Sequence, residues 1–384
     1  MTNNVYCTAP WNGITVRENG DVKTCCNGRT VLGNLNQDNI QNILESKNLR
    51  EIQDSIINKD INSKNCQVCI QHEKQTGLSS LRQHYLKFYP DIYPKLKLKN
   101  LDIRWNNLCN LGCVYCSPTF SSVWEDRLSS RTNKPTKPYQ TDLLEFILEN
   151  IEQVDELMLV GGEPMLMKQN YELFNRLPES TNISIVTNFS YDLERLPCFN
   201  DLIKRPRQNI RWNLSLENFG DKFEYVRNGA NWAEVEKNFE VLNKYWVDNI
   251  SINLVYSMFT AFDLSESIQK FHQLGIKKFT LQTYYGPRAL DVSSMPRPIR
   301  ELALAQLDDT LMVHQNLIHV EDRDLYPLGN ITNIQQHLSS THSPELLTKT
   351  EFYRHIETQC DKWNTSKFKD LWPHIVTLVD RYLV

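Results

Sequence analysis

Three cysteines lie within eight residues of this 384-residue chain, at Cys109, Cys113 and Cys116, and they restrict its possible folds more than any other feature. Their spacing is C-x3-C-x2-C, and they follow a run of alternating apolar residues from Leu101 to Trp105 that is typical of a strand. Cysteine thiolate is the ligand that iron normally takes from a protein in iron–sulfur clusters. Three thiolates can hold one face of such a cluster and leave one iron without a protein ligand. We therefore expect a metal site with an open iron directly after a strand.

Two simpler interpretations of these cysteines stay open. A structural zinc site needs four closed ligands, but Ser117, Pro118 and Thr119 follow the run and His84 lies well upstream. Unrelated core cysteines have no physical reason to cluster at this spacing. An iron–sulfur cluster is therefore the favoured interpretation.

With Tyr115 as the aromatic residue, the pattern C-x3-C-x-aromatic-C resembles the signature of the radical S-adenosylmethionine (radical SAM) superfamily. In that family the three cysteines hold a four-iron four-sulfur (4Fe–4S) cluster, and the fourth iron binds the amino and carboxylate groups of SAM. The resemblance implies that the cluster ligands are Cys109, Cys113 and Cys116. It also implies that the region of Tyr115 contacts the adenine of SAM.

Strand-like and helix-like segments alternate from Asn100 onwards. The short β-branched or apolar runs lie at about 101–105, 156–160, 182–187, 210–216, 250–256 and 276–282. Helical spacing marks two of the segments between them, at 232–246 and 264–274. This alternation predicts parallel strands joined by right-handed crossovers. The fold class is therefore α/β, an open, partial (β/α)6 TIM-like barrel like that of the superfamily, with its chemistry after the carboxyl ends of the strands.

A Gly161-Gly162-Glu163-Pro164 motif follows the second predicted strand. Glycines let the backbone approach a ligand, and a carboxylate can accept hydrogen bonds from an ammonium group. On its own the motif is most often only a turn. At this place it resembles the GGE motif with which radical SAM enzymes bind the amino group of SAM, which implies cofactor contacts for Gly161, Gly162 and Glu163.

Polar residues end the next two predicted strands, where the family places contacts to the ribose or carboxylate of SAM. They are Asn188 and Ser215; nearby, Glu217 stands where many relatives have aspartate. Arg227 lies in a stretch similar to one in twitch-containing relatives, whose arginine faces the SAM carboxylate. A guanidinium fork matches a carboxylate, although an arginine that caps a loop is the simpler interpretation.

A second group of cysteines lies near the N-terminus, at Cys7, Cys25, Cys26, Cys66 and Cys69. Alternating residues at 14–16 and a glycine at 20 predict a small hairpin that presents Cys7 and Cys25 together. Cys66-Gln67-Val68-Cys69 is a metal knuckle. Spacing alone leaves either a cluster or a zinc site open for these thiolates.

The pattern C-x12-G-x4-C followed by C-x2-C is similar to the SPASM or twitch modules that carry auxiliary clusters in many radical SAM enzymes. The resemblance implies one auxiliary 4Fe–4S cluster, with Cys25 at the expected position and Cys26 as the spare or alternative ligand. The order along the chain differs, because such a module usually follows the barrel.

These assignments divide the chain into four parts. We expect a SPASM/twitch-like module at 1–75, a helical connector at 76–99, the barrel at 100–299 and a helical C-terminal extension at 300–384. Cys198 and Cys360 stand alone and are expected to be buried as hydrophobic residues.

The composition of the chain limits which binding partners and which cellular location we expect. The formal charge is −4 and no block of like charge stands out, so nothing indicates a nucleic-acid or membrane partner. Neither a secretory signal nor an apolar run of membrane-spanning length is evident, which predicts a cytoplasmic protein.

The resemblance implies an oxidoreductase or modifying enzyme that cleaves SAM to a 5′-deoxyadenosyl radical and abstracts hydrogen from a substrate. The expected substrate is a peptide or protein side chain, with a small sugar or aminocyclitol as the alternative. The expected electron source is an external one-electron donor such as a flavodoxin or ferredoxin. From a different class, a non-catalytic iron–sulfur or zinc protein stays open.

Overall fold

The computed structural model describes residues 6–60, 64–76, 81–128, 142–284, 286–317, 327–339 and 347–384. A parallel sheet forms the centre of the molecule, and strands that follow one another along the chain lie side by side in it. The strands are β4 (Asn100–Ile103), β5 (Glu156–Leu159), β6 (Asn182–Thr187), β7 (Ile210–Ser215), β8 (Ile250–Tyr256) and β9 (Phe279–Thr283). Every neighbouring pair among them is parallel. The strands predicted from Asn100 onwards are therefore confirmed, with ends that differ by a few residues.

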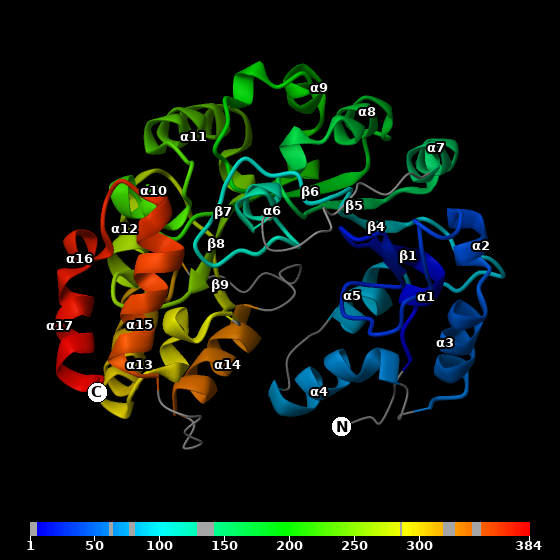
Figure 1. Cartoon of the computed structure of the whole chain (residues 1–384). Coiled ribbons are helices and arrows are strands. Elements are labelled where there is room, and N and C mark those ends of the chain that lie inside the picture. Colours follow the sequence, from blue (N-terminus) through cyan, green and yellow to red (C-terminus); the bar gives the residue numbers. More distant parts are fainter. Residues whose placement is uncertain are drawn as a thin grey trace.

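Helices cover the outer face of this curved sheet (Figure 1). They are α7 (Leu143–Glu149), α8 (Lys168–Arg176), α9 (Phe199–Lys204), α11 (Trp232–Trp246) and α12 (Leu264–Gln273). Large aromatic side chains fill the layer between them and the strands: Trp212 of β7 lies with its ring centroid 5.4 Å from that of Trp246 of α11. Because the sheet ends at β9 and does not return to β4, the barrel is open, as predicted.

The N-terminal segment extends the same sheet. β1 (Gly13–Val16) and β2 (Asp21–Lys23) form the predicted hairpin, and the short β3 (Gly33–Asn34) pairs with β2. β1 also pairs with β4 in parallel, from Gly13 opposite Asn100 to Val16 opposite Ile103. The result is one nine-stranded sheet in the order β3-β2-β1-β4-β5-β6-β7-β8-β9. The sequence did not predict this continuity between the N-terminal module and the barrel.

Short helices complete the N-terminal module and connect it to the barrel. They are α1 (Ala9–Asn12), α2 (Ile40–Leu44), α3 (Lys47–Ile57), α4 (Gln67–Thr76) and α5 (Leu81–Phe88). On α5, the backbone carbonyl of Tyr85 accepts a hydrogen bond from the Thr8 hydroxyl at 3.2 Å, and the His84 ring lies 2.9 Å from the Glu156 carboxylate of β5. The connector therefore contacts both parts. Residues 77–80 of the predicted connector lie outside the described residues.

The C-terminal extension is largely helical, as predicted, and packs on the barrel at the left of Figure 1. Its helices are α13 (Arg297–Val313), α14 (Pro327–Ser339), α15 (Lys349–His355), α16 (Phe368–Leu371) and α17 (Pro373–Tyr382). The Trp372 indole donates to the Asp263 carboxylate at 2.9 Å, and the Tyr225 hydroxyl of α10 (Gly220–Val226) donates to Asp361 at 2.8 Å. Buried polar contacts of this kind hold the extension in one place.

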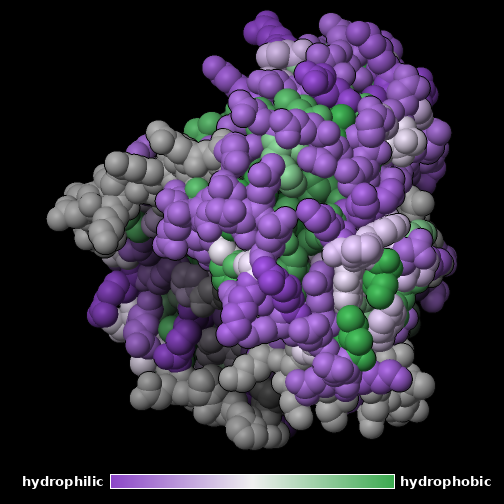
Figure 2. All heavy atoms as spheres, turned by 90° about the vertical axis from the view of Figure 1, so that its right-hand side faces the viewer, coloured by the Kyte–Doolittle hydropathy of each residue, from purple (hydrophilic) through white to green (hydrophobic). Residues whose placement is uncertain are grey.

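Hydrophilic side chains dominate the face that carries the N-terminal module and α7, with apolar side chains visible only in small areas between them (Figure 2). Among the residues that the structure describes, no helix has both the length and the apolar character needed to cross a membrane.

The close pairing of β1 and β4 can be tested at Gly13, which has an extended backbone that any residue can adopt. A Cβ atom at this position would lie 2.8 Å from the Asn100 carbonyl oxygen and 2.5 Å from the Tyr85 hydroxyl. Gly13→Val should therefore lower the free energy of unfolding by about 1 to 3 kcal/mol, because the backbone of β4 must move. Denaturant unfolding measures this, with Glu152→Val at an exposed position as a control expected to stay within about 0.5 kcal/mol of the parent. Equal stability of the two variants would contradict the described pairing.

Candidate active site

A cavity of about 500 Å³ opens at the carboxyl edge of the parallel strands. Residues that end or follow consecutive strands form its wall, from Arg104 after β4 to Ser215 at the end of β7. The loop with the cysteine run forms the opposite wall. The cavity brings together most of the site residues predicted for the barrel, namely Cys109, Cys113, Tyr115, Cys116, Gly161, Gly162, Asn188, Ser215 and Arg227.

Hydrogen-bond donors point at the sulfur atoms of the cysteine run. The Leu111 backbone N–H and the Asn188 side-chain amide donate to Cys109 Sγ at 3.5 and 3.7 Å. Arg227 Nη1 donates to Cys113 Sγ at 3.7 Å. Burial raises the pKa of all three thiols, that of Cys116 to about 11, so metal binding must displace their protons. Donors in these positions stabilise the thiolate form that iron needs.

Backbone and side-chain hydrogen bonds hold the cysteine loop rigidly. Gly112 N–H and Val114 N–H donate to the carbonyls of Asn228 and Val226, both at 2.9 Å. From α6 (Ser122–Leu128), the Trp124 indole donates to the Cys113 carbonyl at 2.8 Å. The loop is thereby held from both sides by protein hydrogen bonds.

Arg127, also on α6, links this loop to the C-terminal extension. Its guanidinium carbon lies 5.2 Å from the ring centroid of Trp124 and 4.5 Å from that of Trp363. One guanidinium nitrogen donates to the Gly112 carbonyl at 3.2 Å, and another donates to the Asn228 side chain. Asn228 in turn donates to the Trp363 carbonyl at 2.6 Å. No local sequence pattern marks Arg127, because only the fold brings Trp363 beside it.

Gly161 and Gly162 adopt positive φ angles of 80° and 49°, which favour glycine. Space is restricted as well, since a Cβ atom on Gly162 would lie 2.2 Å from the Leu108 carbonyl oxygen. The turn after β5 can therefore lie directly against the residue that precedes Cys109.

Glu163 differs from the other predicted residues, because its side chain does not line the cavity. It is fully buried and accepts hydrogen bonds from Met165 N–H at 3.0 Å, the Thr187 hydroxyl at 2.9 Å and Asn188 N–H at 2.8 Å. Burial raises the pKa of this carboxyl group to about 7. In this structure Glu163 joins the turn after β5 to the end of β6, and its direct contact with SAM stays a prediction.

Arg227 lines the cavity with its charge balanced by Glu217. The guanidinium donates twice to this carboxylate, at 2.8 and 2.6 Å, and both side chains are buried. It also lies over the Tyr115 ring, with the guanidinium carbon 5.6 Å from the ring centroid. The contact of Arg227 with the SAM carboxylate stays a prediction.

The predicted N-terminal cysteines lie close to one another. Burial raises the pKa of the Cys25 thiol. Four neighbouring thiols raise this pKa further, namely those of Cys26, Cys7, Cys69 and Cys66. Side-chain amides of Asn27 and Asn65 donate to the sulfur atoms of Cys69 and Cys66, at 3.5 and 3.9 Å. Thiolates are the protein ligands of iron–sulfur clusters.

Cys26 has different surroundings from Cys25. Burial raises the pKa of its thiol to about 12, and after burial the strongest influences are Asp102, which raises it further, and Arg104, which lowers it. Only Cys69 of the other cysteines contributes among the leading causes. The charged groups that most affect the Cys26 thiol are therefore Asp102 and Arg104, whereas those that most affect the Cys25 thiol are the other cysteines.

The described residues contain no group of three His, Cys, Asp or Glu side chains that lie close enough to hold one metal ion. A site for a single metal ion therefore finds no support among them. Cys198 and Cys360 are 1% and 0% exposed, so their predicted burial is confirmed.

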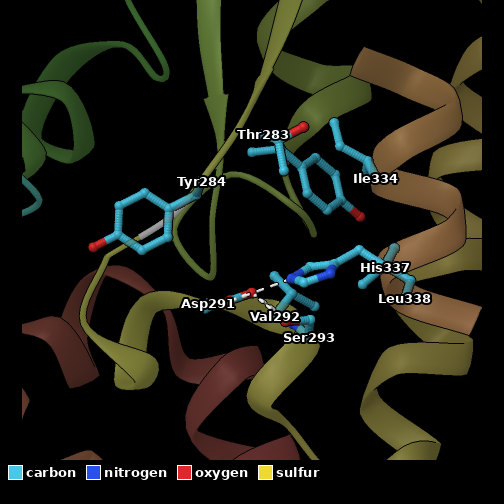
Figure 3. Close-up of a pocket in the computed structure, with 9 residues that line it drawn as sticks. Thr283, Tyr284, Asp291, Val292, Ser293, Ile334, His337 and Leu338 are labelled. Atoms are coloured by element: carbon cyan, nitrogen blue, oxygen red, sulfur yellow. Dashed lines mark hydrogen bonds and ion pairs between the residues drawn. The ribbon is translucent and has the colours of Figure 1, made fainter. Parts of the chain in front are cut away.

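A second, small pocket lies behind the end of β9 (Figure 3). His337 Nε2 lies 3.7 Å from the Asp291 carboxylate there, and the Ser293 hydroxyl donates to the same carboxylate at 2.7 Å. The Tyr284 ring points away from His337 in this view. It instead meets the Tyr115 ring edge to face, with centroids 6.3 Å apart, and so lies between this pocket and the cysteine cavity.

Two family models match separate parts of the chain. Residues 103–259 match the family model of the radical SAM superfamily, and residues 7–70 match that of the SPASM iron–sulfur cluster-binding domain. No curated protein sequence matches the chain.

Solved structures give more distant similarities. Native anSMEcpe with bound AdoMet is 15% identical at a TM-score of 0.40, covering 74% of this chain and 99% of that one. Streptococcus suis SuiB bound to its precursor peptide SuiA is 16% identical at a TM-score of 0.39, covering 70% of this chain and 59% of that one. Coproporphyrinogen III oxidase (HemN) from Escherichia coli is 13% identical at a TM-score of 0.36, covering 64% of this chain and 52% of that one.

The role of Arg127 can be tested by substitution. Arg127→Ala removes charged hydrogen bonds and two cation–π contacts, so it should lower the free energy of unfolding by about 1.5 to 3 kcal/mol. Denaturant unfolding measures this loss, and iron retained after gel filtration reports on the loop. Arg127→Lys should lie between parent and Ala variant, because an ammonium cannot stack as a planar group. Arg195→Ala, at a side chain that is 87% exposed, is the control. If Arg195→Ala lowered the free energy of unfolding as much as Arg127→Ala, the assigned link between the cysteine loop and the C-terminal extension would be wrong.

Proposed function

Because the chain belongs to the radical SAM superfamily and carries a SPASM domain ahead of its barrel, we propose that Cys109, Cys113 and Cys116 hold its SAM-cleaving 4Fe–4S cluster. The observation that carries this proposal is the arrangement of three thiols on one cavity at the carboxyl edge of the strands. The donors directed at Cys109 and Cys113 support it, since thiolate ligands need such partners.

A cluster held by Cys109, Cys113 and Cys116 would, when reduced, supply the one-electron chemistry of the family, which is reductive cleavage of SAM followed by hydrogen abstraction from the substrate. The protein binds and orients SAM and keeps water away from the radical. We assign adenine contact to the region of Tyr115 and polar contacts to Asn188 and Ser215, which follow neighbouring strands. The backbone at Gly161 and Gly162 lies on the cavity wall, so it can approach SAM without a side chain in between.

Three charged residues support SAM binding in this proposal. Arg227 offers the SAM carboxylate its guanidinium, and Glu217 orients that group through two hydrogen bonds. Glu163 acts on SAM through the turn that it braces, because its carboxylate is already satisfied by protein donors. A direct contact between Glu163 and the SAM amino group would require these hydrogen bonds to rearrange.

For the auxiliary 4Fe–4S cluster we assign Cys7, Cys25, Cys66 and Cys69 as ligands. Cys25 is preferred to Cys26 because it has the other thiols as neighbours. A cluster held by these four thiolates would supply an electron acceptor beside the barrel, as a net oxidation of the substrate would require. The potential of such clusters spans a wide range and is set by their surroundings, so it can differ from that of the SAM-cleaving cluster.

We place the substrate among peptide or protein side chains. Leu108 and Phe120, on the loops that flank the cysteine run, are each 43% exposed, and Phe120 lines the cavity. Large exposed apolar side chains at a cavity mouth favour a substrate with an extended contact surface. A flavodoxin or ferredoxin is the expected class of electron donor.

The test of this function is reductive SAM cleavage by the reconstituted protein. With dithionite as reductant, the parent should form 5′-deoxyadenosine and contain about eight irons per chain, four in each cluster. Replacing Cys109, Cys113 and Cys116 together by Ala should abolish the product and leave about four irons. Cys198→Ala is the matched control, because this buried cysteine lies outside both groups and should alter neither measurement. Stoichiometric zinc without iron, or no cleavage by iron-loaded parent, would favour the non-catalytic alternative.

A second variant separates the two clusters. Cys66→Ala with Cys69→Ala should lose the auxiliary cluster and the turnover of substrate while keeping 5′-deoxyadenosine formation with dithionite, since these thiols contribute nothing to the cysteine cavity. Iron content and circular dichroism establish that the barrel cluster and the fold persist. If cleavage disappears although the barrel cluster is intact, the N-terminal module must instead help to build the SAM site.

A further inference from the structure

The end of β1 reaches the same cavity as the barrel strands. Because β1 pairs in parallel with β4, both strands end at the carboxyl edge of the sheet, and the Arg104 N–H donates to the Val16 carbonyl at 3.0 Å. The residues that follow β1, Arg17 and Glu18, line the cavity together with Arg104. The N-terminal module thus supplies a wall of the cavity on the far side of β4 from the proposed SAM contacts at Asn188 and Ser215.

Four charged side chains alternate in sign along this wall. Asp102 lies 3.0 Å from Arg104, Arg104 lies 3.3 Å from Glu18, and Glu18 lies 3.9 Å from Arg17. The Asp102, Arg104 and Glu18 side chains are only 7%, 13% and 3% exposed, whereas that of Arg17 is 35% exposed. The series therefore begins with a buried carboxylate and ends with a guanidinium that is open to the cavity.

Arg17 is the cavity guanidinium best placed to meet a new anion. Arg104 lies between two carboxylates, and Arg227 is held by Glu217 through two hydrogen bonds. The ion pair between Arg17 and Glu18 is at the long end of the range, and such a half-exposed pair stabilises little. A guanidinium fork binds carboxylate or phosphate through two parallel hydrogen bonds.

We propose that Arg17 binds an anionic group of the substrate, a carboxylate or a phosphate. This proposal rests on the proposed function, which defines the reaction of the substrate. It goes further by specifying that the substrate carries a negative charge. The N-terminal module then has a second role beside cluster binding, which is to fix one end of the substrate while the reacting carbon faces the cysteine wall.

The experiment uses the full chain with both clusters reconstituted and SAM bound, without reductant. Phenylglyoxal modifies accessible guanidinium groups, and mass spectrometry follows the modification rate of Arg17 and of Arg195. Arg195 is a control, since it is exposed, ion-paired with Asp192 and remote from the cavity residues. The probes are acetate and inorganic phosphate in separate titrations, and the more protective probe identifies the kind of anion.

An anion at ten times its dissociation constant should slow modification of Arg17 about tenfold and leave Arg195 unchanged. Glu18→Gln should strengthen this protection, because it removes the carboxylate that competes with the anion for Arg17. The proposal is overturned if neither anion protects Arg17 more than Arg195, or if SAM alone already blocks Arg17, which would assign it to the cofactor. No step of this experiment requires turnover, so its failure is distinct from a failure of SAM cleavage.

Discussion

Parallel pairing of strands is the constraint on which the site depends. Parallel strands place all their carboxyl ends at one edge, so residues that are far apart in sequence meet there. Arg104, Gly161, Asn188 and Ser215 follow or end successive strands and line one cavity for this reason. The cysteine loop, which follows β4, is held at the same edge by its backbone hydrogen bonds to Val226 and Asn228.

In the proposed cluster site, buried thiols would have to lose their protons in order to bind iron. Burial opposes the thiolate form at all three barrel cysteines. Donors to sulfur and a rigid loop oppose this cost, since no further ordering is needed when metal binds. Trp363 and Asn228 contribute to this rigidity through Arg127, which makes the C-terminal extension part of the site rather than an appendage.

Much of the fold and of the cavity could be predicted from the sequence, because the relevant signals are local. Alternation of strands and helices located β4 to β9, and the residues just after the strands included most of the cavity wall. Contacts between remote segments had no local signal. The pairing of β1 with β4, the placement of Arg127 beside Trp363 and the cavity position of Arg17 depend on which segments meet in space. Glu163 illustrates a different limit of sequence-based prediction. Its motif predicts where in the fold the residue lies, but not the direction in which its side chain points.

The pairing of β1 with β4 also has a consequence for synthesis on the ribosome. β1 is flanked by β2 on one side and needs β4 on the other, but residues 100–103 emerge long after residues 13–16. During that interval the nascent N-terminal module has an open strand edge, Gly13 to Val16, whose residues are all buried in the finished fold. An unpaired edge of this kind can pair with other chains. The order of the two domains along the chain thus makes the arrival of β4 the event that protects the newly made module from aggregation.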